Sequence, residues 1–422
     1  MTLAVYPARP PLALPEKILR VVLTLMFGLS CLSFIEPSPY ELFFFLMFPA
    51  MLLTNVRITQ TTLAFFFIVF ALVVSQFFSL IPYLEHRPTD GSLTPAIYTV
   101  YTVYLYISAI MFALVFSEQT DERLSLVLKA YAFSCAFAGA WGILSFADVG
   151  GLNAREPIDG RIAGPFKDPN VLGSYCIMGV LVFVQGLLLH RRYTLIKLTG
   201  LGIAFVGGVF FSLSRGSMGA MMFALIFLLT TTWFTSGRPV RRRMMRGFAV
   251  IACLIAIGVG YAATNSKFSE NVGQRAKLEQ EYDGGVTGRF GNQKRSIPLL
   301  IERPFGFGPL MFPTRYWLQP HNSYVGAFSD AGWIGGLSFI ILVLSTSFIG
   351  IRLAIKDNPF RRHAQVVTPA ALGFFLQAIQ IDIDHWRFVF LMIGAIWGME
   401  AARRFPSDVV RLRSSRSPSV RA

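Results

Sequence analysis

The chain has 422 residues, of which 54% are hydrophobic and only 14% are charged, and its mean hydropathy is +0.55. This balance excludes a soluble globular protein. The net charge of +15 could indicate a nucleic-acid partner. However, Lys and Arg accumulate in the cytoplasmic loops of membrane proteins, so we expect no nucleic acid to bind.

Apolar runs of about 17 to 25 residues recur along the chain, and this length matches the roughly 30 Å hydrocarbon layer of a bilayer. Every backbone group in that layer must be satisfied within the segment, so we expect the spans to be helices. The chain is therefore predicted to be one all-α polytopic membrane domain over residues 1–422. About twelve spans are expected, at residues 18–35, 40–55, 61–82, 97–117, 124–147, 171–189, 194–213, 216–235, 247–264, 323–350, 365–381 and 386–401.

The basic residues predict the orientation of the chain. If the N-terminus is cytoplasmic, the arginine cluster at 241–246 and the basic tail at 403–422 both face the cytoplasm, as the positive-inside rule requires. An even number of spans then makes both termini cytoplasmic. We expect the Ser/Arg-rich tail to be disordered and interpret it as a topology anchor, with binding to anionic lipid as the alternative.

The motifs whose residues could bind a substrate or catalyse a reaction fall on the opposite side of the predicted membrane domain. Its longest connection is a polar loop at residues 265–322. The four cysteines lie inside or at the edge of predicted spans, and no His/Cys spacing, HExxH motif or P-loop glycine pattern occurs. We therefore expect neither a metal nor a cofactor.

Arg161 and Asn170 belong to the first of these motifs, RIAGPFKDPN. Arg161 is a candidate contact for an anion because it lies near the membrane on the side of the motifs. Asn170 directly precedes an apolar run, so it could be a substrate ligand or the cap of the next helix.

Arg215 lies in the sequence SLSRGS between two apolar runs, with almost no loop to hold it away from hydrocarbon. A charge at that depth costs at least about 2.5–3.5 kcal/mol on insertion scales, so such residues usually face a cavity or a partner. The alternative is that Arg215 extends to the lipid headgroups and only ends a helix.

The long loop contains Arg289 and Arg295 and ends at His321 and Asn322, where the chain re-enters the membrane. An imidazole can take a proton from a hydroxyl group at neutral pH. His321 is therefore a candidate general base. Arg295 and Asn322 are candidate substrate contacts.

A second acidic and basic cluster, DIDHWR at residues 382–387, follows the next predicted span. Asp382 and Asp384 could orient His321 or an arginine, or they could form a local ion-pair network. Several arginines beside one histidine at a membrane surface suit a lipid diphosphate, because the guanidinium group binds phosphate with two hydrogen bonds. Arginines could then stabilise the leaving diphosphate in place of a metal.

In this order, the motifs resemble those of the O-antigen ligase and polymerase superfamily of polytopic bacterial membrane proteins. The resemblance covers roughly residues 160 to 340 and depends on the combination of motifs. Five segments carry it, namely RIAGPFKDPNVLG at 161–173, SLSRG at 212–216, Gly288-Arg289, the turn at 304–308, and HNSYVGAFSDAGWIGG at 321–336.

The resemblance implies a GT-C-like fold in the bacterial inner membrane and a metal-independent, inverting glycan transfer. The donor would be a glycan on undecaprenyl diphosphate, and the site would face the periplasm, as would the loop at 265–322. The important arginines of the family match Arg215 and Arg289, and its important histidine matches His321.

Two further matches with the family are less direct. Arg161 lies in the matching earlier motif. An acidic residue after the penultimate span also matters in the family, and both Asp382 and Asp384 qualify.

The leading interpretation is a ligase that transfers a lipid-linked polysaccharide to lipid A-core, in contact with membrane lipids. The alternative is a polymerase that joins repeat units of O-antigen or exopolysaccharide, and a protein-glycosylating relative is a third possibility. A flippase for the same lipid-linked glycan should carry charges at several depths near helix breaks. Here the candidate residues gather on one face, which favours the enzyme.

Overall fold

The computed structural model describes residues 13–35, 37–54, 56–85, 94–157, 160–247, 285, 288–316 and 318–405. Within these ranges the chain forms helices and no strand. Six helices are long and apolar enough to cross a membrane, which confirms a polytopic helical membrane protein. The six are Gln60–Pro82, Thr94–Ser117, Thr120–Phe146, Pro169–Leu189, Arg215–Thr235 and Ser323–Ile355.

Each predicted span that falls on described residues contains one helix or two consecutive helices. The first is shorter than expected, since its helix ends at Gly28. The span at 247–264 lies outside the described residues, and the number of twelve stays a prediction. The helices are α1 (Leu14–Gly28), α2 (Pro39–Leu52), α3 (Gln60–Phe78), α4 (Leu80–Glu85), α5 (Thr94–Ser117), α6 (Thr120–Phe146), η1 (Val149–Arg155), α7 (Pro169–Leu189), α8 (Thr194–Ile203), η2 (Ala204–Phe210), α9 (Arg215–Thr235), α12 (Arg289–Ile301), α13 (Phe312–Tyr316), α14 (Ser323–Ile355), α15 (Arg361–Gln377) and α16 (Arg387–Arg404).

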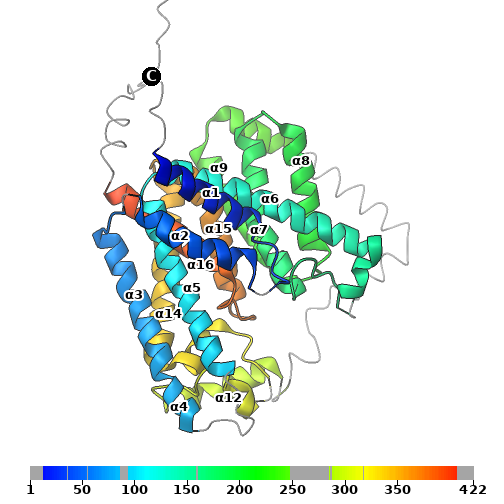
Figure 1. Ribbon diagram of the computed structural model, residues 1–422. Coiled ribbons are helices and arrows are strands. Elements are labelled where there is room, and N and C mark those ends of the chain that lie inside the picture. Colours follow the sequence, from blue (N-terminus) through cyan, green and yellow to red (C-terminus); the bar gives the residue numbers. More distant parts are fainter. Residues whose placement is uncertain are drawn as a thin grey trace, which may run out of the picture.

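The long helices pack in neighbouring pairs. α5 packs on α16, α3 on α14, and α9 on α15, while α1 packs on α2 and α6 (Figure 1). α16 is buried along almost its whole length, as expected of a helix at the centre of a bundle. One continuous core therefore joins the first and last helices.

One end of the bundle, called the basic end below, holds Glu16, Arg123, Arg352 and Glu400. Arg123 forms an ion pair of 2.6 Å with Glu16, and Arg352, Arg403 and Arg404 all contact the fully buried Glu400. A buried carboxylate is costly unless it is paired. Arg123 and Arg352 therefore each join two helices at this end, as well as carrying the charge that orients a chain.

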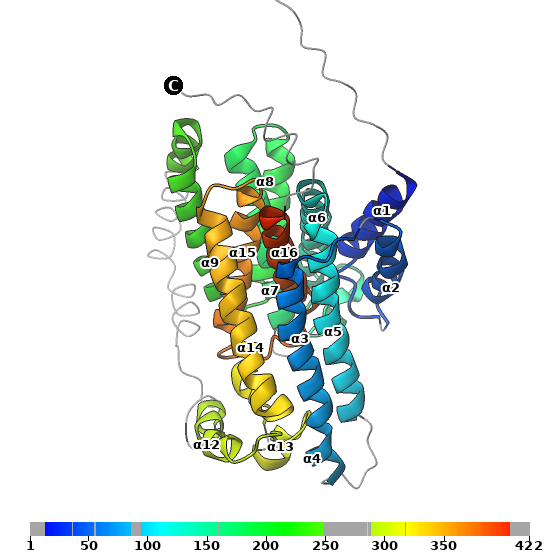
Figure 2. The same ribbon diagram turned by 90° about the vertical axis from the view of Figure 1, so that its left-hand side faces the viewer.

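The opposite end is called the motif end and carries residues 161–170, 212–217, 288–323 and 378–386. Of the predicted loop at 265–322, the described part forms α12 and α13, which lie beside the N-terminal part of α14 (Figure 2). The predicted loop is thus partly helical. The predicted disordered tail falls on described residues only at 403–405, where α16 ends.

Candidate active site

The start of α14 and the turn after α15 are joined by one serine. The Ser323 N–H donates to the carbonyl of Ala378 at 2.8 Å, and its hydroxyl donates to the carbonyl of Ile381 at 3.1 Å. The same hydroxyl accepts the N–H of Ile383 at 2.8 Å. The turn at 378–383 is therefore wrapped around the first residue of α14, which brings two distant sequence motifs together.

This junction places His321 beside Asp382. The Nδ1 atom of His321 lies 3.5 Å from Oδ2 of Asp382, and each side chain is about one-third exposed. A carboxylate facing Nδ1 favours the tautomer that leaves Nε2 free to accept a proton. Catalytic contacts are often longer than ordinary hydrogen bonds before substrate binds. The pair therefore has the geometry of a general base with its orienting acid.

The backbone of His321 is held in a conformation that few side chains adopt. Its φ is 45°, in the left-handed region, where non-glycine residues are strained. The carbonyl of Pro320 accepts a hydrogen bond of 2.8 Å from Nε2 of Gln293. The N–H of Asn322 donates a hydrogen bond of 3.0 Å to Oδ1 of Asp382. Both neighbours of His321 are thus fixed by side chains from other segments.

Asn322 is the N-cap of α14. Its Oδ1 accepts the N–H groups of Tyr324 and Val325, and its Nδ2 lies 3.3 Å from Oε1 of Gln293. Asn is among the preferred capping residues because its side chain satisfies the first free N–H groups of a helix. The contacts of Asn322 are thus structural, and its predicted contact with substrate stays a prediction.

Gln293 was not singled out from the sequence, where it is one residue of a polar stretch in a long loop. We expect Gln293→Leu to lower the turnover rate of this site by about tenfold to a hundredfold, the loss expected when a reacting group is slightly misplaced. The substrate concentrations needed for half-maximal rate should change little, because Gln293 holds the backbone before His321. Turnover of the purified protein measures this, with the exposed neighbour Lys294→Gln as control. An unchanged rate in Gln293→Leu would contradict the positioning role.

Arg161 connects the first two motifs. Its Nε donates to the carbonyl of Ser212 at 3.1 Å, and its Nη2 donates to Oδ1 of Asn170 at 2.7 Å. The cap of α7 is Asp168, whose carboxylate accepts the N–H of Asn170. The alternative that Asn170 is the cap is therefore wrong. Its side chain holds Arg161 instead.

Serine hydroxyls continue this connection between helices. Ser217 contacts Ser174 at 2.9 Å, and Ser174 contacts Gln377 at the end of α15. A Cβ atom on Gly173 would lie only 2.5 Å from Oγ of Ser212, so the two motifs can approach this closely only with glycine at that position. α7, α9 and α15 therefore meet at the motif end.

Arg215 is the first residue of α9 and is exposed. Ser214 caps the helix by accepting the N–H of Ser217 at 3.3 Å. The adjacent Gly216 faces Gln377 and Gln380 on the turn that leads to Asp382. Arg215 thus lies on the same end of the bundle as the histidine, at a helix N-terminus, where the helix dipole adds to its attraction for an anion.

Of the two arginines of α12, the structure describes the side chain of Arg295 and only the backbone of Arg289. Arg289 is the first residue of the helix, one turn before Gln293, and its side chain lies outside the described residues. Arg295 is exposed, donates to Oδ1 of Asn292 at 2.6 Å, and lies over the ring of Tyr316. Its role in substrate binding stays a prediction.

Asp384 is separate from His321. Its Oδ2 accepts the hydroxyl of Tyr98 at 2.5 Å and contacts Nδ1 of His385 at 2.8 Å. Burial opposes ionisation of this carboxyl group, but the neighbouring His385 and the two hydrogen bonds outweigh it and hold the pKa of Asp384 below its ordinary value. Farther along, Arg387 is paired with Glu41 at 2.6 Å.

The structure contains contacts of both kinds considered for this cluster. Asp382 contacts His321, and the other charged residues form a local network. Although residues 382–384 read Asp-Ile-Asp, the two carboxylates have different partners. Within the described ranges no group of three His, Cys, Asp or Glu side chains is arranged to hold a metal ion.

The turn at 304–308 docks into a kink of α14. Gly332 has a φ of 64°, which interrupts the helix. The carbonyl of Ser329 accepts the N–H of Phe307 at 2.7 Å, and the N–H of Trp333 donates to the carbonyl of Pro304 at 2.9 Å. A Cβ atom on Gly332 would lie 2.2 Å from the oxygen of Pro304. This glycine therefore permits both the kink and the contact.

We expect Gly332→Ala to destabilise the protein by about 2 kcal/mol or more, because the left-handed conformation alone costs roughly 1–3 kcal/mol for other residues. The midpoint of thermal unfolding of the detergent-solubilised protein should fall. Gly219→Ala is the matched control, since a Cβ there meets nothing within 4 Å and alanine favours a helix. Equal midpoints for the two variants would contradict this interpretation of the kink.

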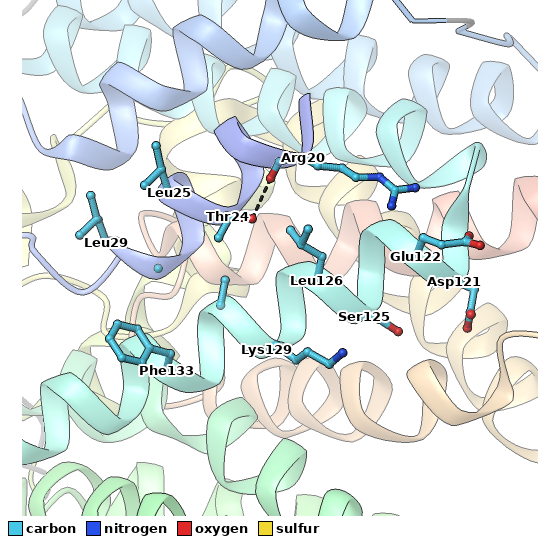
Figure 3. A pocket seen from close by; sticks show the side chains of 12 residues that line it. Arg20, Thr24, Leu25, Leu29, Asp121, Glu122, Ser125, Leu126, Lys129 and Phe133 are labelled. Atoms are coloured by element: carbon cyan, nitrogen blue, oxygen red, sulfur yellow. Dashed lines mark hydrogen bonds between the residues drawn. The ribbon is translucent and has the colours of Figure 1, made fainter. Parts of the chain in front are cut away.

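The size of a cavity does not by itself identify the candidate active site. A cavity of about 750 Å³ lies between α1 and α6, with apolar side chains such as Leu25 and Phe133 and charged ones such as Arg20 and Lys129 (Figure 3). It belongs to the half of the bundle that carries the basic end. A cavity of about 220 Å³ borders Asp382 at the motif end.

Comparison with known proteins adds one finding. No curated protein matches the chain. Residues 200–340 match the family model described as O-antigen ligase, a range that includes Arg215, Arg289, Arg295 and His321. The match confirms the resemblance inferred from the motifs: over these residues the chain is similar to the O-antigen ligase and polymerase superfamily.

Proposed function

We propose that this protein is an O-antigen-ligase-type glycosyltransferase that moves a glycan from undecaprenyl diphosphate to a hydroxyl group of lipid A-core. The reaction is metal-independent and inverting, and it takes place at the periplasmic face of the inner membrane. The observation that carries the proposal is the pairing of His321 with Asp382 at 3.5 Å, at the same end of the bundle as Arg215. The family match supports the donor class.

In the proposed reaction the acceptor oxygen attacks the anomeric carbon from the side opposite the diphosphate. The bond between that carbon and the diphosphate oxygen breaks, and the diphosphate leaves with the electron pair. Nε2 of His321 takes the hydroxyl proton, and Asp382 stabilises the resulting imidazolium.

Arginines would hold the leaving group. The diphosphate gains negative charge as the bond breaks, and guanidinium groups fixed in place stabilise that charge more in the transition state than in the ground state. We assign this role to Arg215 and Arg289, with Arg161 supporting the segment that precedes α9. The hydrogen bonds of Arg161 to Ser212 and Asn170 support its supporting role.

Deletion of the gene, read out on glycan gels, tests the proposal. A ligase deletion should leave lipid A-core without polymer and should accumulate lipid-linked polymer. Lipid A-core carrying a single repeat unit, or the loss of a separate exopolysaccharide, would contradict the ligase and indicate the polymerase of the same superfamily. A normal glycan pattern would contradict both.

A further inference from the structure

The cavity of about 220 Å³ at the motif end borders the histidine pair through Asp382. It lies between α3, α5 and α14, and it is closed by the segment before His321 and by the turn after α15. Its polar lining includes Gln76, Asp330, Asp382 and Asp384, together with side chains that can donate hydrogen bonds, such as Tyr98 and His385. Of these residues only Asp382 has a role in the proposed reaction.

Gln76 is the most informative of these side chains. It is only 5% exposed, and its Oε1 accepts no hydrogen bond from any described residue. A buried acceptor without a partner costs free energy, and native structures contain few of them. An acceptor left open at the wall of a cavity indicates a ligand with a hydrogen-bond donor.

The charges in the cavity limit what that ligand can be. Carboxylates accept hydrogen bonds but do not donate them when ionised. The carboxylates of Asp382 and Asp384 and the open amide oxygen of Gln76 therefore suit a group with several donors, such as a sugar ring with its hydroxyls. They repel a diphosphate. The arginines at 161 and 215 are outside the lining of this cavity and have the opposite charge.

The volume of the cavity also favours a sugar ring as its ligand. Pockets for larger ligands usually measure about 300–1,000 Å³, so a cavity of about 220 Å³ suits a single ring rather than an oligosaccharide. Asp382 borders this cavity and also contacts His321. His321 itself is outside the lining of this cavity, so Asp382 is the group that connects the cavity to the general base.

We propose that this cavity is the acceptor subsite and binds one sugar ring of the acceptor glycan through its hydroxyl groups. The proposal rests on the proposed function and deepens it, because it divides the site into an acidic half for the acceptor and a basic half for the donor diphosphate. His321 and Asp382 lie at the boundary. Asp384, held by Tyr98 and His385, also lines the acidic half.

Steady-state kinetics of the protein in liposomes test this division. The donor is lipid-linked glycan, the acceptor is lipid A-core, and each is varied while the other is kept at a high concentration. In Gln76→Leu the acceptor concentration for half-maximal rate should rise about tenfold, the effect of one lost hydrogen bond of ordinary strength. The corresponding donor concentration should stay within about twofold of wild type.

Two further variants keep the test decisive. Asp330→Asn should raise the same acceptor concentration, since it changes a polar group in the lining of the cavity with little change of volume. Gln60→Leu is the matched control, because it makes the same substitution at the exposed first turn of the same helix. Its kinetics and its level in the membrane should equal those of wild type.

The outcomes separate the two proposals. An active wild type whose Gln76→Leu and Asp330→Asn variants keep the normal acceptor dependence, or change the donor dependence instead, overturns the acceptor subsite and leaves the enzyme intact. A wild type that forms no product with lipid A-core overturns the proposed ligase itself.

Discussion

Replacement of His321 should abolish glycan transfer without preventing membrane insertion. A general base typically contributes about 10²–10⁴-fold to the rate, so a strain that carries only the variant should show no polymer on lipid A-core. The physical reason is the position of His321, whose Nδ1 faces Asp382 at 3.5 Å. Glycan gels and the amount of variant protein in the membrane measure the two parts of this expectation.

His321→Asn is the sharper form of this test. Asparagine tolerates the left-handed conformation better than alanine does, so it keeps the backbone, where φ is 45°, and removes the base. His363→Ala at the basic end is the control, since His363 contacts Asp121 there. Normal polymer on lipid A-core in His321→Asn would contradict the proposed mechanism.

Loss of Arg215 should have the second large effect. Removal of one group that stabilises developing charge costs about 10²–10³-fold in rate, so Arg215→Ala should accumulate lipid-linked polymer as the deletion does. Arg215→Lys should recover only part of the activity, because an ammonium group cannot make the paired hydrogen bonds of a guanidinium group.

The rate of a single turnover in purified protein measures the Arg215 effect. Arg361→Ala is the control, since Arg361 is paired with Asp357 away from the motif end. If Arg215→Ala weakened membrane insertion but transferred glycan at the normal rate per molecule, Arg215 would only end a helix at the headgroups. That is the alternative interpretation of this arginine.

The helices could be predicted closely because their signals are local. A run of apolar residues has no stable alternative to a helix inside a bilayer, and the predicted segments 97–117 and 216–235 agree with α5 and α9. The end of α1 was less predictable. The predicted span continues to residue 35, but the helix ends at Gly28. The next residues are held by side chains of other helices: the hydroxyl of Ser30 contacts that of Tyr175, and the N–H of Cys31 donates to Oγ of Ser134.

The choice between Asp382 and Asp384 shows where local signals fail. The two carboxylates are two residues apart and equally polar in sequence. Asp382 contacts the histidine because Ser323 holds the turn at 378–383 against α14, whereas Asp384 contacts Tyr98 of α5. Those contacts join segments separated by about 60 and almost 290 residues along the chain, and no spacing rule encodes them.

The sequence by itself determined that this chain is a polytopic membrane protein, that its chemical motifs resemble those of the O-antigen ligase and polymerase superfamily, and that His321 and Arg215 are the leading candidates for catalytic residues. Apolar length and motif order are properties of the chain, so they can be read without coordinates. Only the tertiary structure decided that Gln293 fixes the backbone around His321, that Asp382 is the residue beside it, and that Gln76 faces an acidic cavity. These are properties of packing between distant helices, where a side chain acquires its role from the groups it contacts.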